Sequence, residues 1–130
     1  MEKPMRLLPA LSLMILMAPA DAAHAAGAEV DSPVMEIVSF RLTPGTTDTA
    51  FLAAAAATAA PLQSQPGFQT RQLTRAEDGT WTDHVRWSSL AAAMAGADAM
   101  MADPAFGPFM ALIDGPTVTM RHDSIAFAMD

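Results

Sequence analysis

The run WTDHVRWSS, from Trp81 to Ser89, is the part of the sequence richest in side chains that could do chemistry. Asp83 could take a proton from a phenol-like ligand if burial raised the pKa of its carboxyl group toward neutrality. His84 is a second candidate for acid–base chemistry, because the unperturbed pKa of histidine is about 6.5. Asp83 and His84 are therefore the candidate catalytic residues.

Both residues also have structural interpretations. Successive side chains of a regular strand point to opposite faces, so Asp83 and His84 should not pair with each other. Asp83 could instead pair with an arginine or lie at the wet end of its strand, and His84 with Arg86 could shape a subunit interface. His122 is separated from His84 by two strand spacings of ~4.8 Å each in the expected sheet, so the two could share a metal only across a dimer. We expect no metal site and no cofactor, because no zinc motif, phosphate loop or nucleophile elbow is present.

Hydrophobic patterning predicts four strands around this run. The third strand, Trp81 to Trp87, should pair with the second through a hairpin at Asp78 and Gly79. Its alternation should turn Trp81, Val85 and Trp87, with Asp83 among them, toward the helices. The other strands are expected at residues 35–42, 68–75 and 117–128.

Two helices should connect these strands. The first is capped by Thr46 or Thr47, kinked by Pro61 and ended by Pro66 and Gly67. Its buried stripe should contain Phe51, Ala55, Ala59 and Leu62. The second is capped by Ser88 or Ser89 and ended by Asp103 and Pro104, with a short irregular helical segment following it. Its stripe should contain Leu90, Met94, Ala97 and Met101.

This order of elements predicts an α+β, ferredoxin-like βαββαβ fold. Its four-stranded antiparallel sheet has the strand order 4-1-3-2 and carries both helices on one face. Apolar residues on both faces of the first strand, and Val118, Met120 and Ile125 in the last, indicate that the second face is also covered. A second copy would cover it, so we expect a homodimer that forms a dimeric α+β barrel.

Residues 35 to about 127 resemble the antibiotic biosynthesis monooxygenase-like (ABM-like) domains of the dimeric α+β barrel proteins. The resemblance is carried by MEIVSFRLTPG, QPGF, DGTWTDHVRWSS and FMALID. It implies a small-molecule cavity between each sheet and its own helices. It also implies members that oxidise quinol-like or polyketide aromatics without metal or flavin, beside haem-degrading relatives and members without known activity. No catalytic motif carries over residue by residue.

Two functions from different classes follow. One is a cofactor-independent monooxygenase or related small enzyme acting on a hydrophobic or aromatic small molecule. The alternative is a non-catalytic periplasmic small-molecule-binding or stress-related module that uses the same cavity. The expected cavity residues are Phe51, Trp81, Trp87, Met94, Phe106 and Phe109.

The N-terminus has the pattern of a secretory signal peptide. Lys3 and Arg6 precede an apolar run from Leu7 to Met17, which is too short for the ~20 residues of a membrane-spanning helix. Cleavage near Ala25 would leave a linker at 26–34 and the domain at 35–130, in the periplasm or outside the cell. The net charge of -7 and the scattered arginines of the mature chain, which form no basic patch, favour neither nucleic acid nor, once the leader is removed, a membrane as partner.

Overall fold

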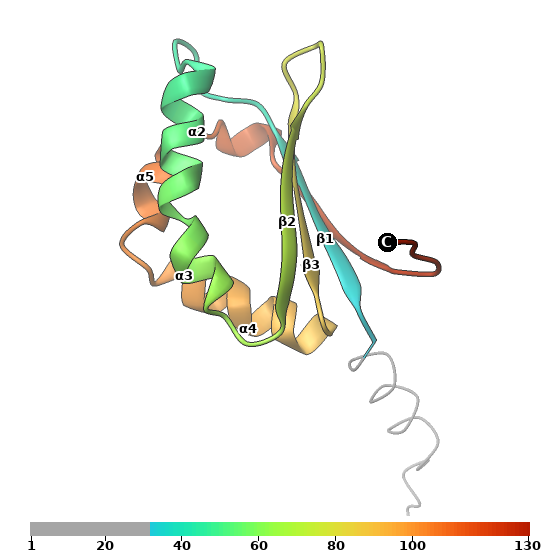
Figure 1. Ribbon diagram of the computed structural model, residues 1–130. Coiled ribbons are helices and arrows are strands. Elements are labelled where there is room, and N and C mark those ends of the chain that lie inside the picture. Colours follow the sequence, from blue (N-terminus) through green and yellow to red (C-terminus); the bar gives the residue numbers. More distant parts are fainter. Residues whose placement is uncertain (1–31) are drawn as a thin grey trace, which may run out of the picture.

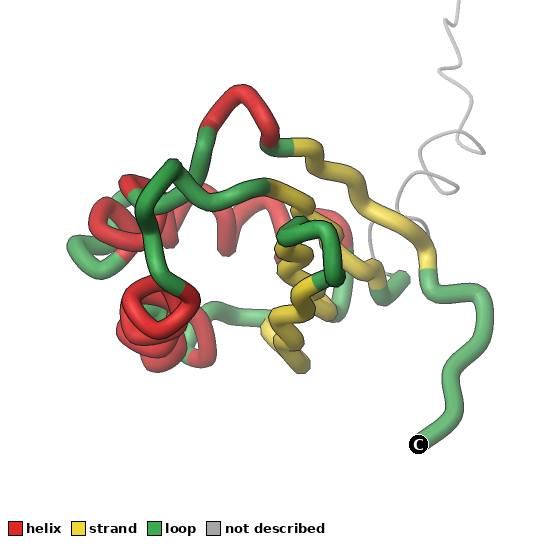
Figure 2. The backbone as a smooth tube through the Cα atoms, turned by 90° about the horizontal axis from the view of Figure 1, so that it is seen from above, coloured by secondary structure: helices red, strands yellow, loops and turns green. Residues whose placement is uncertain are grey.

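The computed structural model describes residues 32–130 as one antiparallel sheet with helices against one of its faces (Figures 1 and 2). The sheet has four strands in the order β2-β3-β1-β4. The strands are β1 (Val34–Phe40), β2 (Phe68–Arg75), β3 (Trp81–Trp87) and β4 (Thr119–Ser124). The helices are α2 (Asp48–Ala57), α3 (Ala59–Gln63), α4 (Leu90–Met101), α5 (Phe106–Ala111) and the short 3-10 helix η1 (Gly115–Thr117). The predicted fold class and strand order are confirmed.

The predicted leader and residues 26–31 of the predicted linker lie outside the described residues. Val34, the last residue of that linker, is the first residue of β1. Within residues 32–130, none of the helices has both the length and the apolar character that crossing a membrane requires.

Strand β3 places its residues as the alternation predicts. Trp81, Asp83, Val85 and Trp87 are buried on the face toward the helices, and the residues between them are only half-buried. Strand β1 runs antiparallel to β3, with Phe40 opposite Trp81 and Val34 opposite Trp87. The same face of β1 therefore carries Val34, Glu36, Val38 and Phe40.

The first predicted helix is two helices that meet at Thr58. Thr47 caps α2 by accepting a hydrogen bond from the amide of Ala50. Pro61 lacks an N–H group, and its ring excludes the normal position of the carbonyl group of Ala57, four residues earlier. The helix that was predicted to be kinked by Pro61 is therefore interrupted at Thr58. The hydroxyl group of Thr58 donates to the carbonyl oxygen of Ala55.

The buried face of α4 differs from the predicted stripe. Ala93, Gly96 and Met100 are buried, whereas Met94 and Met101 are 56% and 68% exposed. The reason is the indole ring of Trp87, because a Cβ atom on Gly96 would overlap with the far edge of that ring. The small residues Ala93 and Gly96 therefore face Trp87 and the sheet, and Met94 lies on the exposed side of α4.

The face of strand β4 away from the helices is polar, although the sequence predicted apolar residues on that face of the sheet. Met120 is opposite Val38 and His122 is opposite Glu36, so both lie on the helix side. The other face of β4 carries Thr119, Arg121 and Asp123, which are polar. The strand also ends at Ser124. In the tail that follows, Phe127 and Met129 are 81% and 83% exposed, and Figure 1 shows that this tail lies on the side of the sheet away from the helices.

The contact between Gly96 and Trp87 leads to a stability prediction. Gly96→Ala should lower the free energy of unfolding by about 1–3 kcal/mol, because the added methyl group overpacks the core. In an unobstructed helix the same change should stabilise by up to about 1 kcal/mol. Gly107→Ala is the matched control, since nothing lies within 4 Å of a Cβ atom at that helical glycine. Urea unfolding of the two variants should give opposite signs, and equal effects would contradict the packing described.

Candidate functional site

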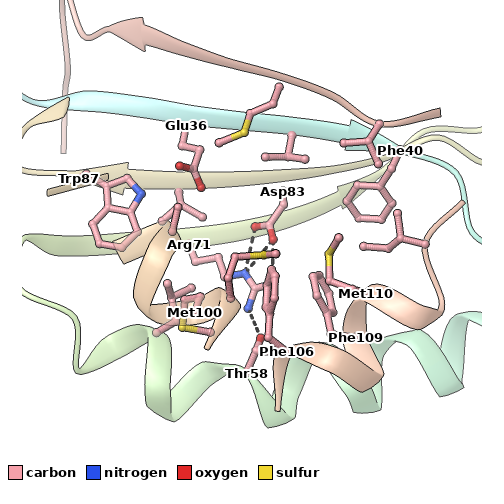
Figure 3. A pocket seen from close by; sticks show the side chains of 18 residues that line it. Glu36, Phe40, Thr58, Arg71, Asp83, Trp87, Met100, Phe106, Phe109 and Met110 are labelled. Atoms are coloured by element: carbon pink, nitrogen blue, oxygen red, sulfur yellow. Dashed lines mark hydrogen bonds and ion pairs between the residues drawn. The ribbon is translucent and has the colours of Figure 1, made fainter. Parts of the chain in front are cut away.

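A cavity of about 230 Å³ lies between the sheet and the helices (Figure 3). It separates two groups of core residues, one around Trp87, Leu62 and Met100 and the other around Phe40, Phe51 and Trp81. Its lining is mostly apolar and comprises Glu36, Val38, Phe40, Thr58, Leu62, Arg71, Asp83, Val85, Trp87, Ala97, Met100, Met101, Phe106, Phe109, Met110, Ile113, Val118 and Met120. The site is therefore a small apolar chamber with a few polar groups.

The predicted cavity residues divide into three groups. Trp87, Phe106 and Phe109 line the cavity. Phe51 and Trp81 are not in the lining but pack behind it. The centroid of the Phe51 ring is 4.9 Å from that of Trp81 and 5.4 Å from that of Phe109. Met94 is on the exposed side of α4, so its predicted place in the lining is wrong. Met100, Met101, Met110 and Met120 line the cavity instead and provide adaptable apolar contacts.

Asp83 lies in the cavity wall and is bound by Arg71 of β2, which matches the arginine-pairing interpretation. Nε of Arg71 is 2.9 Å from Oδ1 of Asp83, and Nη2 is 2.7 Å from Oδ2. Nη1 of Arg71 donates to the hydroxyl oxygen of the buried Thr58 at 2.8 Å. The guanidinium carbon lies 5.5 Å from the centroid of the Phe109 ring. Both oxygens of Asp83 are therefore engaged in a bidentate ion pair with Arg71.

A second carboxylate, Glu36 of β1, also lines the cavity. Its Oε2 atom is 3.0 Å from Nε2 of His122 on β4, and the two side chains are 13% and 19% exposed. No other hydrogen-bond partner of Glu36 is found within residues 32–130, so Oε1 has none. Unlike Asp83, Glu36 keeps one oxygen available at the cavity surface.

The surroundings of Glu36 raise the pKa of its carboxyl group above the usual value. The largest cause is burial, which disfavours the charged form, and the negative charge of Asp83 acts in the same direction. The hydrogen bond and the charge of His122 oppose the rise in pKa. Because the folded state binds this proton more readily than the unfolded chain, Glu36 contributes stability at low pH that is lost as pH rises through its raised pKa.

Trp87 leaves a buried donor without a partner. In the part of the chain that the structure describes, its Nε1 atom is the one buried side-chain nitrogen or oxygen that makes no hydrogen bond. An unpaired buried donor costs about 1–3 kcal/mol. The nitrogen edge of the ring is turned toward the middle of the cavity in Figure 3. An acceptor atom of a bound molecule would satisfy it.

His84 lies on the opposite face of β3 from Asp83. Its Nε2 atom is 3.1 Å from the hydroxyl oxygen of Thr74 on β2, and it is not part of the cavity lining. The structure therefore does not bring the two predicted catalytic residues together. Among residues 32–130, no three His, Asp or Glu side chains form a group that could hold a metal ion.

Glu36, Arg71 and Thr58 were not recognised as site residues from the sequence. A signal for Glu36 was present, because period-two alternation in β1 places it between the apolar Val34 and Val38 on the buried face. A carboxylate in that position is unusual unless it is paired. The partner of Arg71 could not be found this way, because the pairing depends on the register of β2 against β3.

Solved structures of other proteins share this architecture. No family model matches the chain, and no curated protein matches it. A point mutant of SnoaB, a cofactor-independent oxygenase from Streptomyces nogalater, is 22% identical with a TM-score of 0.59, covering 75% of this chain and 97% of its own. Rv0793 from Mycobacterium tuberculosis is 21% identical with a TM-score of 0.59, covering 76% of this chain and 100% of its own. A candidate antibiotic biosynthesis monooxygenase from Caulobacter crescentus is 14% identical with a TM-score of 0.61, covering 80% of this chain and 99% of its own.

The chain has the fold of these proteins. The resemblance to ABM-like domains expected from the sequence is thereby confirmed at the level of the fold. At these identities it carries no residue roles.

The environment of Glu36 gives a directional prediction for its titration. Carboxyl ¹³C NMR of glutamate-labelled protein should show a Glu36 midpoint above the usual glutamate range, assigned by the loss of the signal in Glu36→Gln. Asp83→Asn should lower that midpoint, because it removes a neighbouring negative charge. His122→Phe should raise it further, because it removes the opposing hydrogen bond and charge. A change of either midpoint in the other direction would contradict the geometry described.

Proposed function

We propose that this protein is a cofactor-independent monooxygenase for a hydrophobic hydroxy-aromatic molecule that binds in the cavity. The observation that carries this proposal is the apolar cavity of about 230 Å³ between the sheet and the helices. An apolar cavity of about 150 Å³ is large enough for benzene. A molecule with one or two aromatic rings is therefore a suitable occupant.

The polar groups of the lining are few and suit an oxygen-bearing ring. The unpartnered N–H group of Trp87 can donate to a ligand oxygen, and the carboxylates of Glu36 and Asp83 lie in the same wall. Pockets with this composition fix the orientation of a ligand by a few polar contacts and bind it by apolar contact. The oxygenase SnoaB, which shares the fold, is cofactor-independent.

The reaction balances without a reductant other than the substrate. A quinol and O₂ give a hydroxyquinone and water, so one oxygen atom enters the ring and the other leaves as water. All four electrons that reduce O₂ come from the quinol. The protein has to bind the ring, promote loss of its hydroxyl proton and shield the reacting anion from water.

Oxygen consumption tests this function. With hydroquinones and dihydroxynaphthalenes, wild-type protein should consume O₂ above the rate in buffer, and ¹⁸O₂ should label the hydroxyquinone product. Ala97→Phe should lower kcat/KM at least tenfold, because a phenyl group fills the cavity that Ala97 lines. Ala95→Phe is the matched control on the exposed side of α4 and should retain the rate. Ring binding without O₂ consumption would instead support the non-catalytic binding module.

The proposal includes export and a homodimer. The apolar run after Lys3 and Arg6 is the basis for export, with cleavage near Ala25. Met35 and Ile37 lie on the face of the central strand β1 away from the helices. The tail after β4, which includes the exposed Phe127 and Met129, extends on the same side of the sheet (Figures 1 and 2). A second copy is the partner that would cover both, because each copy presents the same apolar residues.

Protein recovered from the periplasm of an expressing bacterium tests both points. Its intact mass should correspond to a chain that begins near Ala26, and light scattering should give twice that mass. Ile37→Glu should yield a folded monomer, because it places a charge at the centre of the interface. Ala95→Glu, on the exposed side of α4, should remain dimeric. A full-length mass, or a monomeric wild type at micromolar concentration, would contradict the respective part of the proposal.

A further inference from the structure

The two carboxylates of the cavity are held very differently. Asp83 receives hydrogen bonds from Arg71 on both of its oxygens. Glu36 is bound through Oε2 alone, by His122, and its Oε1 atom has no partner among residues 32–130. A carboxylate oxygen without a hydrogen-bond donor is the one best placed to accept a proton that arrives from a ligand. Glu36 has such an oxygen, whereas both oxygens of Asp83 already accept from Arg71.

We infer that Glu36, positioned by His122, is the proton acceptor for a hydroxyl group of the bound ring. In this step the O–H bond of the ligand breaks and its electron pair stays on the ligand oxygen. The proton passes to Oε1 of Glu36, so that an aryl oxide and a neutral glutamic acid replace a phenol and a carboxylate. This assignment rests on the proposed function and names the group that performs its first step.

The position of Glu36 fits this step. It lines the cavity from the central strand β1, between the strands that carry Asp83 and His122. Figure 3 shows its carboxylate on the same side of the sheet as Trp87 and Asp83. The Nε1–H group of Trp87, which has no partner, is the available donor for the oxygen that becomes negative. Base and donor thus belong to one wall of the cavity.

The charged surroundings of Glu36 support the assignment. Asp83 of β3 faces it and is paired with Arg71 of β2, and His122 of β4 binds it. The cavity residues of α4 and α5 are apolar. Burial and the charge of Asp83 raise the pKa of Glu36. The pKa of Glu36 is thereby closer to that of a phenol, which is about 10, and proton transfer from the phenol is less unfavourable. His122 keeps the carboxylate oriented and limits that rise.

The ionisation of a bound chromophoric phenol tests this inference without turnover. The probe is 4-nitrophenol, whose phenol and phenolate forms have separate absorption bands. If Glu36 takes the proton, Glu36 and the bound phenol hold one proton between them over a range of pH. Within that range, the fraction of bound probe in the phenolate form should be nearly independent of pH. At two pH units below the midpoint of the free probe, wild-type protein should show a phenolate band several times larger than free probe. Glu36→Gln should bind the probe with a phenolate fraction that falls about tenfold per pH unit, as expected for simple titration.

Three further variants separate this role from a structural one. Glu77→Gln removes an exposed carboxylate from the loop between β2 and β3 and should keep the wild-type band. His122→Ala should reduce the band, and His122→Gln, whose amide can still donate to Glu36, should restore part of it. Circular dichroism and the melting temperature establish that each variant is folded.

The outcomes distinguish the two proposals. A wild-type protein that binds neither 4-nitrophenol nor the quinols would overturn the proposed function together with this assignment. A protein that binds the probe but shows an equal or larger phenolate band in Glu36→Gln would overturn the assignment alone. A band that is lost in Glu36→Gln and kept in Glu77→Gln would establish Glu36 as the acceptor.

Discussion

The ion pair between Arg71 and Asp83 connects the two layers of this structure. It begins on the neighbouring strands β2 and β3, and through Nη1 of Arg71 it reaches Thr58, where α2 ends and α3 begins. The guanidinium group thus joins the sheet to the helix layer across the space between them. Most of the space that this connection crosses has apolar walls.

Such a connection is costly unless every polar group in it is paired. Burying a charged group away from water costs several kcal/mol. Removing one partner of a buried ion pair destabilises a protein by about 3–5 kcal/mol, because it leaves the other charge buried and unpaired. Here both carboxylate oxygens of Asp83 accept from Arg71, and the hydroxyl group of Thr58 both accepts from Arg71 and donates to the carbonyl oxygen of Ala55. The break in the helix at Thr58 is therefore part of the site, because Pro61 disrupts the helix in the same turn in which Thr58 meets Arg71.

The sequence predicted those features that depend on local periodicity. The order of the elements, the hairpin at Gly79, the buried face of β3 and the place of Asp83 on it all follow from patterns of a few residues. The prediction of the buried stripe of α4 was wrong at Met94. The bulky ring of Trp87 needs a small residue, Gly96, opposite it, and hydropathy alone does not describe such a fit of sizes. The pairing of Glu36 with His122 joins residues 86 positions apart. It depends on strand register, which no local pattern supplies.

The two carboxylates show how one sheet face can hold acids with different chemistry. Asp83 is opposite Val38 and Glu36 is opposite Val85 on adjacent strands, so both face the same apolar space. A guanidinium group that makes a bidentate contact engages both oxygens of its carboxylate. An imidazole that contacts one oxygen leaves the other free, and each carboxylate repels the charge of its neighbour. Arg71 binds Asp83 through both oxygens, whereas His122 binds Glu36 through one oxygen only. Burial and the charge of Asp83 also raise the pKa of Glu36. For both reasons, Glu36 is the carboxylate of the cavity that we infer to accept a proton.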